Sequence, residues 1–185
     1  ALPICIAYQV FGSGSKDLVY VPGIISHLEL YWEDPSMAAW LTQLGQHFRV
    51  IILDKRGQGM SDRIESSATL EDRIDDVNAV MQAAHSKSAS LLGFSEGGPL
   101  CLFFAAAYPE KVEKLMLFGS MARFYGAEDY PYSPPYEAFT EKLMPKFGKG
   151  AFVFMLGPKG SVSQEDIERI ARTERMSCSP SAFKK

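Results

Sequence analysis

The sequence predicts an α/β protein, built on a mostly parallel sheet with flanking helices. Short, continuously apolar runs recur along the first 120 residues, and segments with apolar residues at helical spacing lie between them. Continuous runs of this length are typical of strands buried on both faces of a parallel sheet. Strands that alternate with helices are joined by right-handed crossovers in such sheets. The alternation stops near residue 120, so a different arrangement is expected beyond that point.

Five segments are expected to form strands. The first, residues 4–11, is rich in β-branched and aromatic residues and ends at a glycine–serine turn, which is typical of a strand followed by a turn. The other four are the continuous apolar runs, which are residues 18–21, 50–53, 89–92 and 115–118. We expect all four of these runs to be buried.

Three helices are expected between the strands. Residues 36–47 carry apolar side chains at helical spacing, and Thr69 with Asp72 three positions later predicts a capped helix start before the apolar face of residues 74–84. Residues 98–108 are small and apolar on every side, which predicts a buried helix. Pro99 falls in the first turn of this helix, where proline is tolerated.

The chain changes character after residue 120. A proline-rich segment at residues 130–135 precedes two expected helical stretches, one over about residues 136–156 and one that starts at Ser163. Residues 151–156 have the composition of a strand, and periodicity does not decide so short a run.

The amino-acid composition argues against some classes of function. The chain has 185 residues, 46% of them hydrophobic, and a formal net charge of −3. This is an ordinary globular composition for one domain, and it argues against nucleic-acid binding, which needs a basic face. No apolar run approaches the roughly 20 residues needed to span a bilayer.

Cofactor and metal motifs are missing from the sequence. Cys5, Cys101 and Cys178 lie far apart and show neither a disulfide framework nor zinc spacing, so we expect a reducing, cytoplasmic location. The sequence has no phosphate loop and no complete dinucleotide fingerprint, so no cofactor and no metal are expected.

The strongest chemical signal is Gly93-Phe94-Ser95-Glu96-Gly97, between an expected strand and an expected helix. This is the context of a nucleophile elbow, in which a serine sits on a tight, strained turn. Glycines are needed on both sides because larger residues would collide there. Backbone N–H groups at the start of the helix can then stabilise an oxyanion. The alternative interpretation is a glycine-rich turn with no catalytic role.

Two further loops follow expected strands. In residues 21–25, Pro22 has no N–H and Gly23 permits an unusual turn, so the amide of Ile24 is the best candidate for a second oxyanion donor. In residues 54–62, glycines permit tight backbone at the carboxyl end of a strand, where α/β proteins bind ligands. We expect an ion pair between Arg56 and Asp62 to brace this loop. The alternatives are a simple strand-ending turn and a solvated charged loop.

In this order and spacing, the motifs resemble those of the α/β-hydrolases. The residues are Pro22-Gly23, Ser26-His27-Leu28-Glu29, Asp54-Lys55-Arg56-Gly57, Ser95-Glu96-Gly97-Gly98 and Tyr108-Pro109-Glu110. These motifs are most similar to those of a bacterial subgroup whose members are often fused to adenylate or guanylate cyclase domains. The resemblance implies that Ser95 is the nucleophile, that Ile24 and Glu96 provide the oxyanion amides, and that residues 124–185 form a helical cap on a core of residues 1–123. It also favours helix for residues 151–156.

The sequence departs from the family pattern at the catalytic histidine. In these enzymes an acid and then a histidine follow the serine, whereas no histidine follows Ser95 here and the three histidines are His27, His47 and His85. We therefore expect the N-terminal part of a hydrolase, with the C-terminal remainder of that fold as its partner. His27 is a weak candidate for the base, and we expect it to line a pocket with Ile25 and Phe94.

The function predicted from these residues is hydrolysis of a small-molecule carboxylic ester through an acyl-enzyme on Ser95. Two alternatives stay open. One is hydrolysis of a carbon–carbon bond on the same fold. The other is a ligand-sensing module with little or no turnover, which the missing histidine motivates.

Overall fold

The fold is seen in a computed structural model that describes residues 4–64, 68–158 and 160–180. Residues 159 and 181–185 of the expected cap lie outside the described residues. The five strands of a single sheet are β1 (Tyr8–Phe11), β2 (Asp17–Val21), β3 (Arg49–Leu53), β4 (Ala89–Phe94) and β5 (Val112–Phe118). Their order is β1-β3-β2-β4-β5, and only β1 runs antiparallel to its neighbour. The mostly parallel α/β sheet is therefore confirmed, although its first strand is shorter than expected.

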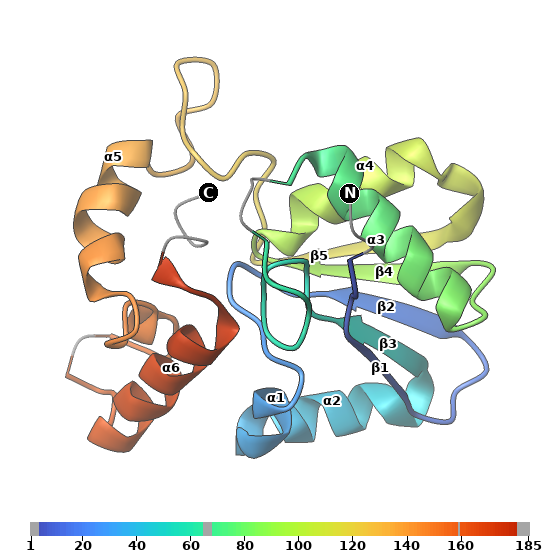
Figure 1. The fold of residues 1–185 in the computed structure, drawn as a ribbon, viewed down its shortest axis with the longest axis horizontal. Coiled ribbons are helices and arrows are strands. Elements are labelled where there is room, and N and C mark those ends of the chain that lie inside the picture. Colours follow the sequence, from blue (N-terminus) through green and yellow to red (C-terminus); the bar gives the residue numbers. More distant parts are fainter. Residues whose placement is uncertain (1–3, 65–67, 159, 181–185) are drawn as a thin grey trace.

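Helices cover both faces of the sheet (Figure 1). On one face, α3 (Leu70–Ala83) and α4 (Gly97–Ala107) pack against alternate residues of the central strands. On the other face lies α2 (Pro35–His47), which follows the one-turn helix α1 (Leu30–Glu33). Side chains of β2 divide between the two layers: Val19 and Val21 face α3 and α4, whereas Tyr20 faces α2. Burial on both faces explains why these strands read as continuous apolar runs.

Two helix starts are fixed by side-chain caps. The Asp34 carboxylate accepts hydrogen bonds from the backbone N–H groups of Ser36 and Met37 at the start of α2, at 2.9 and 3.0 Å. At the start of α3, Thr69 and Asp72 form the expected capping box, in which each side chain accepts from the other's backbone N–H. Both caps satisfy amides that a helix start leaves without partners.

The expectation of a buried last strand is wrong. The side chains of β5 are mostly exposed, because β5 forms an edge of the sheet and has β4 as its only neighbouring strand in the described part of the chain. Phe118 is 66% exposed. Leu102 and Phe103 of α4 are exposed as well, so that helix is not buried on every side as expected.

Residues 136–156 do not form the single helix expected. They are divided into α5 (Tyr136–Ala138), a π-helical turn (Phe139–Leu143) and two 3₁₀ turns (Met144–Lys146 and Val153–Met155). Pro145 and the left-handed conformations of Gly148 and Gly150, with φ of +80° and +94°, explain the breaks. The 151–156 run therefore contains a 3₁₀ turn and no strand.

The second stretch is a regular helix, α6 (Gln164–Ser177), which Ser163 caps as expected. Glu174 of α6 is fully buried, and its carboxylate accepts from the N–H groups of Gly148, Gly150 and Phe152. This one side chain therefore holds the irregular 148–152 segment against the helix. Ion pairs from Arg172 to Glu33 and from Arg169 to Asp34 tie α6 to α1 and α2.

Candidate active site

Ser95 lies on the tight turn between β4 and α4 that the motif predicts. Its φ is +50°, a left-handed conformation that is costly for a residue with a side chain. Its backbone N–H donates to the Phe118 carbonyl at 3.0 Å, which holds the turn at the end of the sheet. The side chain is only half-buried, so it remains reachable from outside.

The glycines around Ser95 are required by close backbone contacts. A Cβ added to Gly97 would lie 2.6 Å from the Pro22 carbonyl oxygen and closer still to that of Val21. At Gly93 it would lie 2.7 Å from the Cα of Gly98. Backbone atoms cannot rotate away as side chains do, so both positions need glycine, as the elbow pattern predicts.

The loop after β2 lies directly beside Ser95. A Cβ added to Gly23 would come within 3.1 Å of the Ser95 Cβ. The next backbone N–H is that of Ile24. Neither this N–H nor that of Glu96 donates a hydrogen bond to any group in residues 4–64, 68–158 and 160–180. The two amides expected to hold an oxyanion are therefore free to bind one.

Glu96 carries an ion-pair network behind the turn. One carboxylate oxygen accepts from the Lys55 ammonium, and the other accepts from Arg73 at 3.1 Å. Burial lowers the pKa of Lys55 below its ordinary value, although Glu96 acts in the opposite direction. Burial raises the pKa of Glu96, but the charges of Lys55 and Arg73 outweigh it, and the net shift is downward. The lowered pKa keeps the Glu96 carboxylate ionised at neutral pH.

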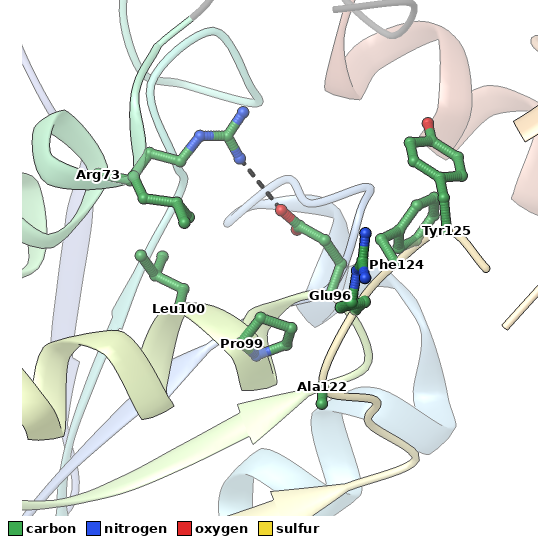
Figure 2. A pocket seen from close by; sticks show the side chains of 9 residues that line it. Arg73, Glu96, Pro99, Leu100, Ala122, Phe124 and Tyr125 are labelled. Carbon is green, nitrogen blue, oxygen red and sulfur yellow. Dashed lines mark hydrogen bonds and ion pairs between the residues drawn. The ribbon is translucent and has the colours of Figure 1, made fainter. Parts of the chain in front are cut away.

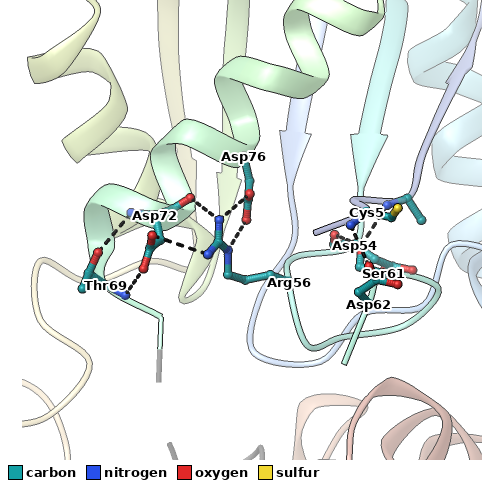
Figure 3. Close-up of polar contacts among 9 residues, drawn as sticks. Cys5, Asp54, Arg56, Ser61, Asp62, Thr69, Asp72 and Asp76 are labelled. Atoms are coloured by element: carbon teal, nitrogen blue, oxygen red, sulfur yellow. Dashed lines mark hydrogen bonds and ion pairs between the residues drawn. The ribbon is translucent and has the colours of Figure 1, made fainter. Parts of the chain in front are cut away.

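The loop of residues 54–62 is braced differently from our expectation. Arg56 does not pair with Asp62: its guanidinium binds both oxygens of Asp76 at 2.6 Å, and Asp62 instead accepts from the Cys5 N–H at 2.7 Å (Figure 3). The predicted ion pair is wrong because α3 presents Asp76, a nearly buried carboxylate, to the same arginine. The buried Asp54 carboxylate adds a second brace by accepting from the Met60 N–H at 2.8 Å.

His27 is the one histidine near this edge of the sheet. His47 ends α2 ahead of β3, and His85 lies between α3 and β4, so both are at the opposite ends of the strands. The His27 side chain is 3% exposed, and its Nδ1 has no hydrogen-bond partner in the described part of the chain. His27 makes no hydrogen bond to Ser95 in the described part of the chain, so the structure does not place His27 as the base.

The other two predicted pocket residues lie in different environments. Ile25 packs with Ile24 against a cluster that includes Phe147 and Phe152, in the segment after residue 120. Phe94 stacks on Phe118, with ring centroids 5.8 Å apart. Their role in a pocket stays a prediction.

A cavity of about 350 Å³ opens beside Glu96, at the start of α4 (Figure 2). Its lining is mainly apolar and comes from α3, α4 and the segment after β5. The lining residues are Leu70, Arg73, Glu96, Pro99, Leu100, Ala122, Arg123, Phe124 and Tyr125. Sequence reasoning missed this cavity, because apart from Glu96 its walls come from residues outside the motifs that were singled out.

No group of three or more histidine, cysteine, aspartate or glutamate side chains with metal-binding geometry occurs among the described residues. No described helix has the length and apolar character to cross a membrane.

The sequence model of the alpha/beta hydrolase fold matches residues 17–152. The chain belongs to the α/β-hydrolase family. Human serine hydrolase BPHL (Homo sapiens) is 32% identical to it over 118 residues, which are 62% of this chain and 39% of that protein.

Two more proteins are similar to the chain. A pimeloyl-(acyl-carrier protein) methyl ester esterase of Pectobacterium carotovorum is 26% identical over 169 residues, 90% of this chain and 62% of that protein. The chain thus spans less than two thirds of the length of both relatives. The esterase structure from Exiguobacterium antarcticum superposes with a TM-score of 0.71 at 23% identity, over 98% of this chain and 70% of that one, which supports the fold alone.

Proposed function

We propose that this chain carries the nucleophile of a serine hydrolase that cleaves a small-molecule carboxylic ester. The observation that carries the proposal is the left-handed Ser95 between β4 and α4, with two free backbone N–H groups beside it. A strained turn of this kind is a recurrent feature of functional sites. The related serine hydrolase and methyl ester esterase support the same reaction class.

In the proposed reaction, the Ser95 hydroxyl oxygen attacks the ester carbonyl. The N–H groups of Ile24 and Glu96 hold the resulting oxyanion, and the alcohol leaves as the acyl-enzyme forms. Water then attacks the acyl-enzyme, releases the acid and restores the serine hydroxyl.

A serine hydroxyl needs an adjacent base to react at a useful rate, and no histidine follows Ser95 in the sequence. We propose that the catalytic histidine and acid come from a C-terminal remainder of the hydrolase fold. The exposed apolar edge of β5 supports this, because it offers unpaired backbone groups to a further strand. Residues 1–123 would then be the first part of the core and residues 124–185 its helical cap, as in the cyclase-fused subgroup that the motifs resemble.

One observation favours a different class of function. Because no histidine follows Ser95, the fold could instead bind a small apolar ligand and sense it without turnover. The cavity beside Glu96 would then be the ligand site.

Labelling by a fluorophosphonate decides between the two functions. In the natural full-length polypeptide we expect one adduct, mapped by mass spectrometry to Ser95 and lost in Ser95→Ala. The matched control is Ser88→Ala at the opposite end of β4, which should label like the wild type. An adduct on another serine, or none at all, would contradict the hydrolase proposal. Ester binding without release of acid would support the sensing function.

A further inference from the structure

Lys55 is a buried cation that the proposed reaction does not use. It follows β3, its side chain is 3% exposed, and its ammonium donates to the Gly23 carbonyl oxygen at 2.7 Å as well as to the Glu96 carboxylate. Burying a charged amine is costly unless it is paired and hydrogen-bonded. The position of this lysine between the two halves of the candidate site therefore needs an explanation.

The Gly23 carbonyl matters because of what lies on the other side of the same peptide bond. Gly23 C=O and Ile24 N–H belong to one planar unit, and no described peptide bond is cis, so the two groups point in opposite directions. A donor that fixes the Gly23 oxygen therefore also fixes the direction of the Ile24 N–H. Glycine at position 23 makes this unit easy to rotate if it is not held.

The next peptide unit is held as well. The Gln58 amide nitrogen donates to the Ile24 carbonyl oxygen at 2.7 Å, and the Gln58 side-chain oxygen accepts from the Ser26 hydroxyl at 3.2 Å. Lys55 and Gln58 thus hold the carbonyls on either side of Ile24, both from the loop that follows β3. No helix or strand includes Ile24. Its backbone is therefore held by these two side chains and not by the regular backbone hydrogen bonds of a helix or sheet.

On the opposite side, Lys55 binds the side chain of Glu96, whose backbone N–H is the other expected oxyanion donor. That amide is already oriented by its own peptide unit, since the Ser95 carbonyl accepts from the Gly98 N–H at 3.0 Å and from the Ser120 hydroxyl at 2.8 Å. The loop amide depends on Lys55, whereas the helix amide does not. One ammonium thereby joins the oxyanion donor of the loop to the donor at the start of α4.

We propose that Lys55 is a positioning residue, which aims the Ile24 N–H at the oxyanion by holding the Gly23 carbonyl and linking it to Glu96. This inference rests on the proposed function. It assigns Lys55 no proton transfer and no contact with substrate. Its effect is confined to the transition state, in which the oxyanion exists, so its loss lowers kcat and leaves KM nearly unchanged.

The test is ester hydrolysis by the natural full-length polypeptide and its Lys55→Met variant. Loss of a whole oxyanion donor costs about 10²–10³-fold in kcat, so we expect a misdirected donor to cost about 10- to 100-fold, with KM changed less than about threefold. Affinity for a trifluoromethyl ketone, which forms a stable oxyanion adduct on serine, should fall by the same factor as kcat/KM. The matched control is Lys111→Met, which removes a lysine that binds Asn78 at the far end of the sheet.

Lys55→Met leaves Glu96 with Arg73 as its remaining cation, and this loss of an ion pair lowers stability by itself. The double variant Lys55→Met/Glu96→Gln removes both charges, and its control is Glu96→Gln. The kcat values of these two variants are compared once their melting temperatures are shown to be equal. The inference holds if adding Lys55→Met again lowers kcat by about 10- to 100-fold. It is wrong if the loss disappears in this comparison, or if KM rises while kcat stays constant. If the wild-type protein shows no turnover, or turnover that Ser95→Ala does not abolish, the proposed function is refuted, and this inference is refuted with it. Turnover that depends on Ser95 and survives Lys55→Met refutes the inference alone.

Discussion

Replacing Gly97 with valine tests whether the turn at Ser95 has the tight packing described above. The added Cβ would lie 2.6 Å from the Pro22 carbonyl oxygen, against 3.4 Å or more for an ordinary contact. The start of α4 must therefore move away from β2 by at least about 0.8 Å. The two γ-methyl groups of valine add further crowding at a position that is already buried.

This displacement has two measurable consequences. Overpacking of this kind costs about 1–3 kcal/mol, and for a chain of this size each kcal/mol lowers the melting temperature by about 2–4 °C. The movement also displaces Ser95 from the two amides, and a misplacement of about 1 Å can cost about 10²-fold in rate. We therefore expect Gly97→Val to melt about 2–12 °C lower and to lose about 100-fold in kcat/KM.

Calorimetry of this 185-residue chain measures the first effect, and ester hydrolysis by the natural full-length polypeptide measures the second. The control is Ala106→Val, which places the same side chain on the exposed side of α4 and should change the melting temperature by less than about 3 °C. A Gly97→Val protein with unchanged melting temperature and activity would refute the argument, because it would show that no close backbone contact constrains the turn.

Two further predictions follow from other parts of the structure. Glu174→Ala leaves three backbone N–H groups of the 148–152 segment without their acceptor, at about 1–3 kcal/mol for each buried group. Urea unfolding should show a loss of about 3 kcal/mol or more, and an unchanged midpoint would contradict this. The 185-residue chain expressed alone should turn over p-nitrophenyl acetate no faster than its Ser95→Ala variant, because no histidine follows the serine. Robust turnover that both Ser95→Ala and His27→Ala abolish would instead make His27 the base.

The parts of the fold that the sequence predicted are those set by local pattern. The central strands and the capped start of α3 depend on residues close in the chain, and the structure has them where the pattern indicates. Local pattern also predicts the elbow, but only part of its cause is local: Gly93 is required by Gly98, whereas Gly97 is required by the Val21 and Pro22 carbonyls of a distant loop. The extent of α4 was predicted equally well, and β5 begins three residues earlier than predicted, but the burial of both was predicted wrongly. Burial depends on which elements cover an edge, and periodicity carries no information about that.

The errors at the site have a common physical cause. The sequence predicted an ion pair between Arg56 and Asp62, which is six residues away. In the structure Arg56 binds Asp76 of α3 instead. A charged side chain reaches whichever opposite charge the tertiary fold brings near it, and sequence distance ranks such candidates poorly. Residues 148–152 show the same limitation, because three of their N–H groups bind Glu174, a residue at least 22 positions further along the chain.

The strand order of the sheet, had it been predicted, would have indicated which residues lie near Lys55. With strand order β3-β2-β4 and all three strands parallel, the segments that follow them must meet at one edge of the sheet. Lys55, Gly23 and Glu96 each lie within two residues of the end of one of these strands. Their proximity is therefore a consequence of strand order, and it can be deduced before any side chain is placed. What strand order does not supply is direction: only the structure shows that the ammonium of Lys55 is turned toward the Gly23 carbonyl, on the side of the peptide unit away from the Ile24 N–H.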